Sequence, residues 1–202
     1  MIVLDLIAIV LVGSLLLFAG YTALQFSGKF PKRTIHDVTP FLRSAEADEF
    51  ELLLDPAQEV NFQFRLSPAE FADCQRKRLL LAREYLLRMS HNSLVLIEWG
   101  NMEAFSQDTC DSAHAQQKQL LAQELVQAAT EFRLYSMLAL FKLRMWLLLP
   151  SGFFLKFSPS LPCLRNLFGI NALGAYGRLK TAAGSLGLAY SNDFQQELLA
   201  RL

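Results

Sequence analysis

The chain has 202 residues, 52% of them hydrophobic, and its 19 acidic side chains balance its 19 basic ones. Its three cysteines, Cys74, Cys110 and Cys163, form neither a metal-ligand spacing nor a C-x-x-C pair. This argues against a metal or redox centre and indicates reduced thiols. The zero net charge conceals an asymmetry, because residues 132–192 contain no acidic side chain, whereas residues 34–131 contain twice as many acidic as basic ones. A long acid-free stretch of this kind indicates an anionic partner.

The first element in chain order is an apolar segment, residues 6–24, that contains no charged side chain. A helix of about 20 apolar residues spans the hydrocarbon core of a bilayer. A cleaved signal peptide is the alternative, but no basic residue precedes the segment and no A-x-A site follows it. We therefore expect residues 1–28 to form a single, uncleaved transmembrane anchor.

The basic residues beside this segment predict its orientation. Lys29, Lys32 and Arg33 lie in a short basic linker, residues 29–38, and basic residues next to a span stay on the cytoplasmic side. We expect a protein of the plasma (inner) membrane with its N-terminus outside. Residues 39–202 would then form one cytoplasmic α-helical domain, long enough to bury a core.

A helix N-cap residue followed by proline recurs three times, which is typical of helix starts. The motif occurs at Thr39-Pro40, Asp55-Pro56 and Ser67-Pro68. Two of the three continue as capping boxes, with Gln58 after Asp55 and Glu70 after Ser67. We predict helices from about Pro40, Pro56 and Pro68. Apolar and polar residues alternate in part of residues 50–66, so a β-hairpin there is the alternative, although the caps favour helices.

The longest predicted elements are two helices joined by a polar turn. The first runs over residues 68–105, and the second runs from about residue 113 to residue 149, where Pro150 and Gly152 end it. Two long helices joined by a short turn lie antiparallel, so we predict a hairpin over about residues 68–149. Its expected buried seam is Leu79, Ala82, Leu86, Met89, Ser93 and Leu96 on the first helix, and Leu121, Leu125, Ala128, Phe132, Tyr135, Ala139, Leu143 and Trp146 on the second.

The remainder, about residues 150–202, predicts basic and apolar C-terminal helices. One is expected near residues 162–183 and a short terminal one at residues 193–202. Gly184 and Gly187 are expected to make the chain that follows the first of these helices less regular.

The end of the hairpin and the segment after it are rich in apolar residues and cations, which is typical of an element that lies in a membrane interface. The predicted membrane-contact residues are Trp146, Phe153, Phe154, Phe157, Lys142, Arg144, Lys156 and Arg165. The expected partner is the lipid bilayer, with a preference for anionic lipid. Two alternatives stay open, a domain core with snorkelling cations and contact with another protein. Nucleic acid is not expected, because the cations are sparse and interleaved with Leu and Phe.

Four ionisable residues of the hairpin predict a polar layer. His91 and Glu98 share a face of the first helix, Glu124 and Glu131 share a face of the second, and a turn near Cys110 would place them opposite each other. No Glu-x-x-His pair accompanies them, so we predict neither a metal nor a cofactor. The cations Arg76, Lys77, Arg78, Arg83 and Arg88 indicate a solvated face, and contact with lipid headgroups at the base of the hairpin is the alternative.

Together these patterns predict an all-α, single-pass membrane protein with a cytoplasmic helical hairpin. No catalytic motif is present, which favours a non-enzymatic adaptor or structural protein that binds an unknown protein or a second copy of itself. The alternatives are an accessory subunit of a larger membrane complex and a helical metal-dependent or lipid-modifying enzyme that uses His91.

Overall fold

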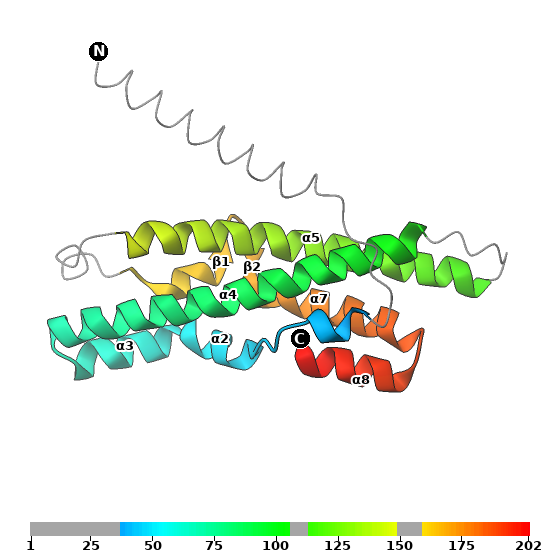
Figure 1. Ribbon diagram of the computed structural model, residues 1–202. Coiled ribbons are helices and arrows are strands. Elements are labelled where there is room, and N and C mark those ends of the chain that lie inside the picture. Colours follow the sequence, from blue (N-terminus) through cyan, green and yellow to red (C-terminus); the bar gives the residue numbers. More distant parts are fainter. Residues whose placement is uncertain (1–36, 106–112, 149–158) are drawn as a thin grey trace, which may run out of the picture. The chain divides into compact units, whose positions relative to one another are not determined.

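The computed structural model describes residues 37–105, 113–148 and 159–202, whose arrangement Figure 1 shows. The chain divides into two units, residues 1–31 and 32–202, and every described residue belongs to the second unit. The predicted transmembrane anchor therefore lies outside the described residues. Within the described ranges, no helix combines the length and the apolar character that crossing a membrane requires.

The described residues are almost all helical, which confirms the predicted all-α class. The two longest helices, α4 (Pro68–Phe105) and α5 (Ala113–Leu147), run antiparallel and form the predicted hairpin (Figure 1). Their apolar seams are buried as expected, apart from the half-buried Leu121 and Trp146. The two helices come close at Gly100, where an added Cβ would lie only 2.7 Å from Cγ2 of Val126.

Three short elements precede the hairpin and cover one side of α4. They are the 3-10 turn η2 (Thr39–Phe41) and the helices α2 (Ala47–Leu53) and α3 (Pro56–Arg65). Residues 50–66 are thus helical except at the junction of α2 and α3, which confirms the interpretation favoured over a β-hairpin. The helix predicted from Pro40 is wrong, because the backbone becomes extended at Leu42 after a single 3-10 turn.

The predicted capping residues explain where α3 and α4 begin. A carboxylate oxygen of Asp55 accepts a hydrogen bond from the N–H of Ala57 at 2.9 Å. At the start of α4, the carboxylate of Glu70 accepts bonds from the N–H of Ser67 at 3.0 Å and from its hydroxyl at 2.7 Å. The Ser67 hydroxyl accepts a weaker bond from the N–H of Glu70 at 3.4 Å. These bonds pair the otherwise unsatisfied groups of the helix end.

The C-terminal part differs from the prediction in its first half. It consists of the 3-10 turn η3 (Leu161–Leu164), the strands β1 (Asn166–Leu167) and β2 (Ile170–Asn171), and the helices α7 (Ala172–Leu188) and α8 (Asn192–Arg201). The helix predicted over residues 162–183 starts only at Ala172, because the two strands pair antiparallel before it. Asn171 then caps α7, its Oδ1 accepting a bond from the N–H of Gly174 at 3.0 Å.

The expectation that Gly184 and Gly187 loosen the chain is also wrong. Helix α7 continues through both and packs against α8, which is the predicted terminal helix. At Gly187 an added Cβ would lie 3.3 Å from Cα of Gln195, so the absence of a side chain lets the two helices approach.

Aromatic side chains hold α7 and α8 against the hairpin. The ring of Phe132 lies 5.0 Å from that of Tyr176, and Trp99 makes an edge contact with Phe194 at 5.7 Å. The buried hydroxyl of Tyr135 donates a hydrogen bond to the carbonyl oxygen of Leu164 at 2.6 Å. This bond ties the middle of α5 to the end of η3, directly before the β-hairpin.

Candidate functional site

Helix α5 changes character along its exposed side. In its first half, the exposed side chains are mostly polar, such as Gln123, Glu124, Gln127 and Thr130, and Leu120 (66% exposed) is the apolar exception. In its second half, Arg144 is exposed, and the other exposed side chains are large and apolar. They are Leu134 (44% exposed), Phe141 (53%), Met145 (52%) and Leu148 (78%), the last just beyond the helix end. The change coincides with the beginning of the acid-free stretch at residue 132.

These apolar residues form a single stripe along the helix. Counting from Leu134, the half-buried Leu138 and then Phe141, Met145 and Leu148 follow at alternating steps of four and three residues. At 3.6 residues per turn, such steps keep side chains on one face. We call these five residues the outer stripe of α5. The opposite face holds the fully buried seam, so the second half of α5 is apolar on both its inner and its outer face.

Two cations border the outer stripe. At about 100° per residue, Lys142 and Arg144 lie roughly 80° to either side of the stripe's centre. Arg144 is exposed, and the ammonium of Lys142 lies 5.1 Å from the centre of the Trp146 ring. An apolar face bordered by cations has the composition of a helix that lies in a membrane interface.

The structure brings together three of the predicted membrane-contact residues, namely Lys142, Arg144 and Trp146 on the end of α5. Arg165 lies apart from them, between η3 and β1, with a guanidinium nitrogen 4.0 Å from a carboxylate oxygen of Glu51 on α2. The remaining predicted contacts lie outside the described residues. They are Phe153, Phe154, Lys156 and Phe157.

Sequence reasoning missed the outer stripe, although its signal is present. The predicted seam of this helix ends with Leu143 and Trp146, and a second apolar period that starts at Leu134 runs on another face. Two interleaved apolar periods on one helix indicate a helix with partners on two sides.

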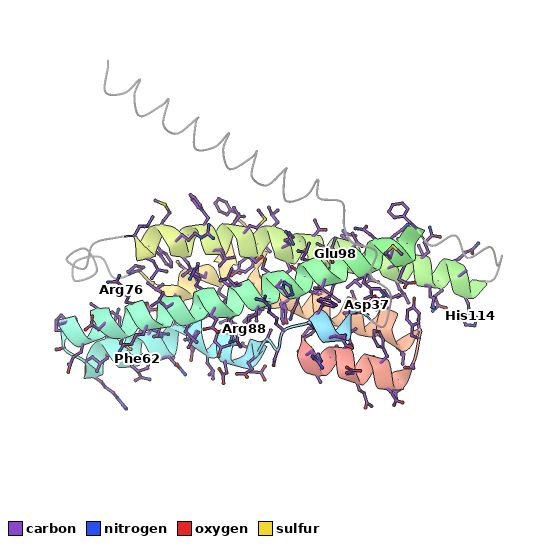
Figure 2. All side chains as sticks on the ribbon, in the orientation of Figure 1. Asp37, Phe62, Arg76, Arg88, Glu98 and His114 are labelled. Atoms are coloured by element: carbon purple, nitrogen blue, oxygen red, sulfur yellow. The ribbon has the colours of Figure 1, made fainter. Side chains whose placement is uncertain are left out.

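The expectation of a solvated cationic face on α4 holds for Arg76 and Lys77 but is wrong for Arg78. Figure 2 places Arg76 near the end of α4 that runs beside the last turns of α5. Arg76 and Lys77 are exposed, whereas Arg78 is only 7% exposed. Adjacent helix positions point about 100° apart, so one residue of a basic run can enter the interior.

Arg78 belongs to a buried polar cluster with Glu59 of α3 and Gln75 of α4. Its guanidinium donates to Oε1 of Gln75 at 3.0 Å and to the carbonyl oxygen of Leu53 at 2.9 Å, and lies 3.7 Å from the Glu59 carboxylate. That carboxylate accepts bonds from Nε2 of Gln75 and from the N–H of Leu161, both at 3.1 Å. The cluster thus joins α2, α3 and α4 to the beginning of η3.

Burial lowers the pKa of the Arg78 guanidinium, and the nearby Glu59 carboxylate opposes this shift. Because every polar group described in the cluster has a protein partner, we assign it a structural role. It holds the beginning of η3 against α3 and α4.

Two of the four residues of the predicted polar layer have partners outside it. Nε2 of His91 lies 3.1 Å from the carbonyl oxygen of Phe41, and Glu131 forms an ion pair with Arg178 of α7. Glu98 is buried, whereas Glu124 is exposed. Across the hairpin, Gly100 of α4 lies against Ala122, Leu125 and Val126 of α5. Among the described residues, no group of three or more His, Cys, Asp or Glu side chains could hold a metal ion.

An open pocket of about 390 Å³ lies between α5 and the end of α7, near the turn of the hairpin. His114 and Lys118 line it from α5, and Ser185 and Leu188 line it from α7. The ammonium of Lys118 lies 3.5 Å from the centre of the Tyr190 ring. Both a hydroxyl, that of Ser185, and an imidazole, that of His114, line the pocket, and no hydrogen bond joins these two described side chains.

The chain was compared with known proteins in three ways. No protein-family model matches it, and neither the curated proteins nor the solved structures give a significant match. The functional argument therefore depends on the surface of the molecule itself.

Proposed function

We propose that this protein is a single-pass, membrane-anchored and non-enzymatic adaptor or structural component, whose helical unit rests through α5 on anionic lipid at the cytoplasmic face of the plasma (inner) membrane. The observation that carries the proposal is the outer stripe of α5, an apolar face bordered by Lys142 and Arg144.

The chemistry of the outer stripe suits a lipid interface. An amphipathic helix at a bilayer buries its apolar face about 5–10 Å into the boundary between headgroups and acyl chains. Each cation near an anionic surface adds about 1 kcal/mol to binding, and carboxylates would oppose it. Residues 132–192 supply the cations and contain no carboxylate. Water-exposed apolar stripes of this kind are uncommon on soluble monomers, which supports a partner for this face.

Two further features support the same proposal. The uncharged segment at residues 6–24 has the length of a membrane span and would keep the helical unit next to the bilayer. The outer stripe ends at Leu148, within the apolar run Trp-Leu-Leu-Leu-Pro-Ser-Gly-Phe-Phe of residues 146–154, so the lipid-compatible sequence continues beyond the stripe. Tethering raises the effective concentration of the surface at the membrane, so even a weak contact would be occupied.

Tryptophan fluorescence tests the proposal directly, because the chain contains only Trp99 and Trp146. Trp99 is fully buried in the core, whereas Trp146 is half-buried near the end of α5, with its ring next to Lys142, one of the cations that border the outer stripe. The full chain would be reconstituted into vesicles of phosphatidylcholine and phosphatidylglycerol with brominated acyl chains. The Trp99→Phe variant retains Trp146, and we expect bromine to quench most of its emission. The Trp146→Phe variant retains Trp99, and we expect its emission to stay unquenched.

Substitutions on the two halves of α5 provide the matched control. Leu134→Gln with Met145→Gln should restore the emission of Trp146, whereas Gln123→Ser with Gln127→Ser on the same exposed side should not. Removing phosphatidylglycerol should weaken the quenching, because the cations then lose their partners. If Trp146 emits equally with and without bromine, the lipid contact is refuted. Cross-linking of Trp146 to a protein would then favour the accessory-subunit alternative.

A further inference from the structure

The turn between β1 and β2 presents an aromatic side chain in an unusual backbone conformation. Phe168 has a φ of 51°, Gly169 follows with a φ of 81°, and the Phe168 side chain is 84% exposed. A two-residue hairpin turn with positive φ at both positions strongly favours Asn, Asp or Gly. Phe168 is therefore unfavourable for the turn, and its ring is not buried in the described core. Such a residue indicates a function outside the fold.

The base of this turn is held firmly against the lipid-facing half of α5. Leu167 is buried, and β1 contacts α5. Tyr135, which belongs to the buried seam of this half of α5, donates its hydrogen bond to the carbonyl oxygen of Leu164 just before the strand. The N–H of Ala172 closes the base by bonding to the carbonyl oxygen of Arg165 at 2.9 Å. In Figure 1 the turn emerges beside α5, so its tip has a defined position next to this helix.

The charges around the β-hairpin formed by β1 and β2 are compatible with an anionic surface. The strands and the turn lie within the acid-free stretch, and Arg165 at their base is exposed. The carboxylate of Glu51 lies at 4.0 Å from Arg165, but both side chains remain about half exposed, so the pair is weak.

We propose that Phe168 is a second lipid contact of this protein, an aromatic wedge that enters the headgroup boundary of the same anionic bilayer on which the outer stripe of α5 rests. The inference rests on the proposed function and adds to it. Two contacts on different elements would fix the orientation of the helical unit on the membrane more closely than one helix face does.

A single tryptophan at the turn tests this proposal. Phe168→Trp would be made in a Trp99→Phe, Trp146→Phe background, and the full chain would be reconstituted in the brominated vesicles. The control is Phe64→Trp in the same background, because Phe64 on α3 is 86% exposed and equally aromatic. We expect the tryptophan at position 168 to lose most of its emission and the tryptophan at position 64 to keep it.

The outcomes separate this inference from the proposed function. Quenching of Trp146 without quenching at position 168 would leave the proposed function standing and overturn the wedge. Equal quenching at positions 64 and 168 would also overturn it, since the contact would then be unspecific.

Hydrogen exchange on the unaltered chain provides a second test, one that does not depend on a substitution in the turn. In lipid nanodiscs, the amides of residues 165–171 should exchange more slowly with phosphatidylglycerol present than with phosphatidylcholine alone, while residues 60–66 stay unchanged. Equal exchange of residues 165–171 in both lipids would contradict the proposal.

Discussion

The side chain of Asn92 forms two hydrogen bonds with the backbone of Arg43, a pair that we call the Asn92 clasp. Its Oδ1 accepts a hydrogen bond from the N–H of Arg43 at 2.8 Å, and its Nδ2 donates to the carbonyl oxygen of Arg43 at 2.7 Å. Asn92 is fully buried on α4, and Arg43 lies in the extended chain between η2 and α2. The amide thus imitates a strand partner and attaches the N-terminal strap, residues 37–46, to the middle of the hairpin.

Removal of this clasp should destabilise the fold. Asn92→Ala leaves both backbone groups of Arg43 without their partner, and we expect the free energy of unfolding to fall by about 1–3 kcal/mol. Urea unfolding of the chain in mild detergent, followed by circular dichroism, measures the change. The control is Asn101→Ala, a half-buried asparagine on the same helix, which should change stability by less. Equal losses in both variants would show that the clasp contributes nothing of its own.

The neighbouring cations Lys77 and Arg78 should respond very differently to truncation. Arg78→Ala leaves the buried carboxylate of Glu59 without its cation, and we expect a loss of about 3–5 kcal/mol. Lys77→Ala removes an exposed charge and should change stability by less than about 0.5 kcal/mol. Combining Arg78→Met with Glu59→Gln should recover part of the loss, because no unpaired buried charge then remains. Similar unfolding midpoints for the two single variants would contradict the buried cluster.

Two helical glycines should respond in opposite directions to alanine. At Gly100 the new Cβ would lie 2.7 Å from Val126 Cγ2 and 3.2 Å from the carbonyl oxygen of Ala122. We expect Gly100→Ala to destabilise the hairpin by about 1–3 kcal/mol and Val126→Ala to relieve part of that clash. At Gly177 nothing lies within 4 Å of the added Cβ, so Gly177→Ala should stabilise α7 by about 0.5–1 kcal/mol. Thermal unfolding of the three variants provides the comparison.

The capping box of α4 should make stability depend on pH in the acid range. The hydrogen bond from the Ser67 hydroxyl, followed by that from its N–H, lowers the pKa of Glu70 from its ordinary value of 4.5. Because the folded pKa is the lower one, this stabilisation is fully present above pH 4.5 and is lost as the pH falls through the folded pKa. Ser67→Ala should reduce the acid dependence of the unfolding free energy, whereas Glu124→Gln at an exposed site should not. An unchanged acid dependence in Ser67→Ala would argue against the reciprocal bonds.

Local patterns in the sequence predict much of this fold correctly. The capping bonds of Asp55 and of Ser67 with Glu70 join residues two or three positions apart, so their spacing is visible in the chain. The buried seam of the hairpin follows from the helical period. The local pattern gave a wrong prediction at residues 162–171, where a helix was expected. Strand pairing formed there instead, because the helical pattern is weak and rich in glycine.

By itself the sequence determined that long helices form, where most of them begin, and that one stretch of the chain carries cations without carboxylates. Only the tertiary structure decided which side chains face outward. Packing used one face of α5 for the core and left Leu134 and Met145 outside, and it drew Arg78 inside while Lys77 stayed in solvent. The physical reason is distance along the chain. The Asn92 clasp and the Glu59 bond to Leu161 join residues 49 and 102 positions apart, and no local pattern encodes such contacts.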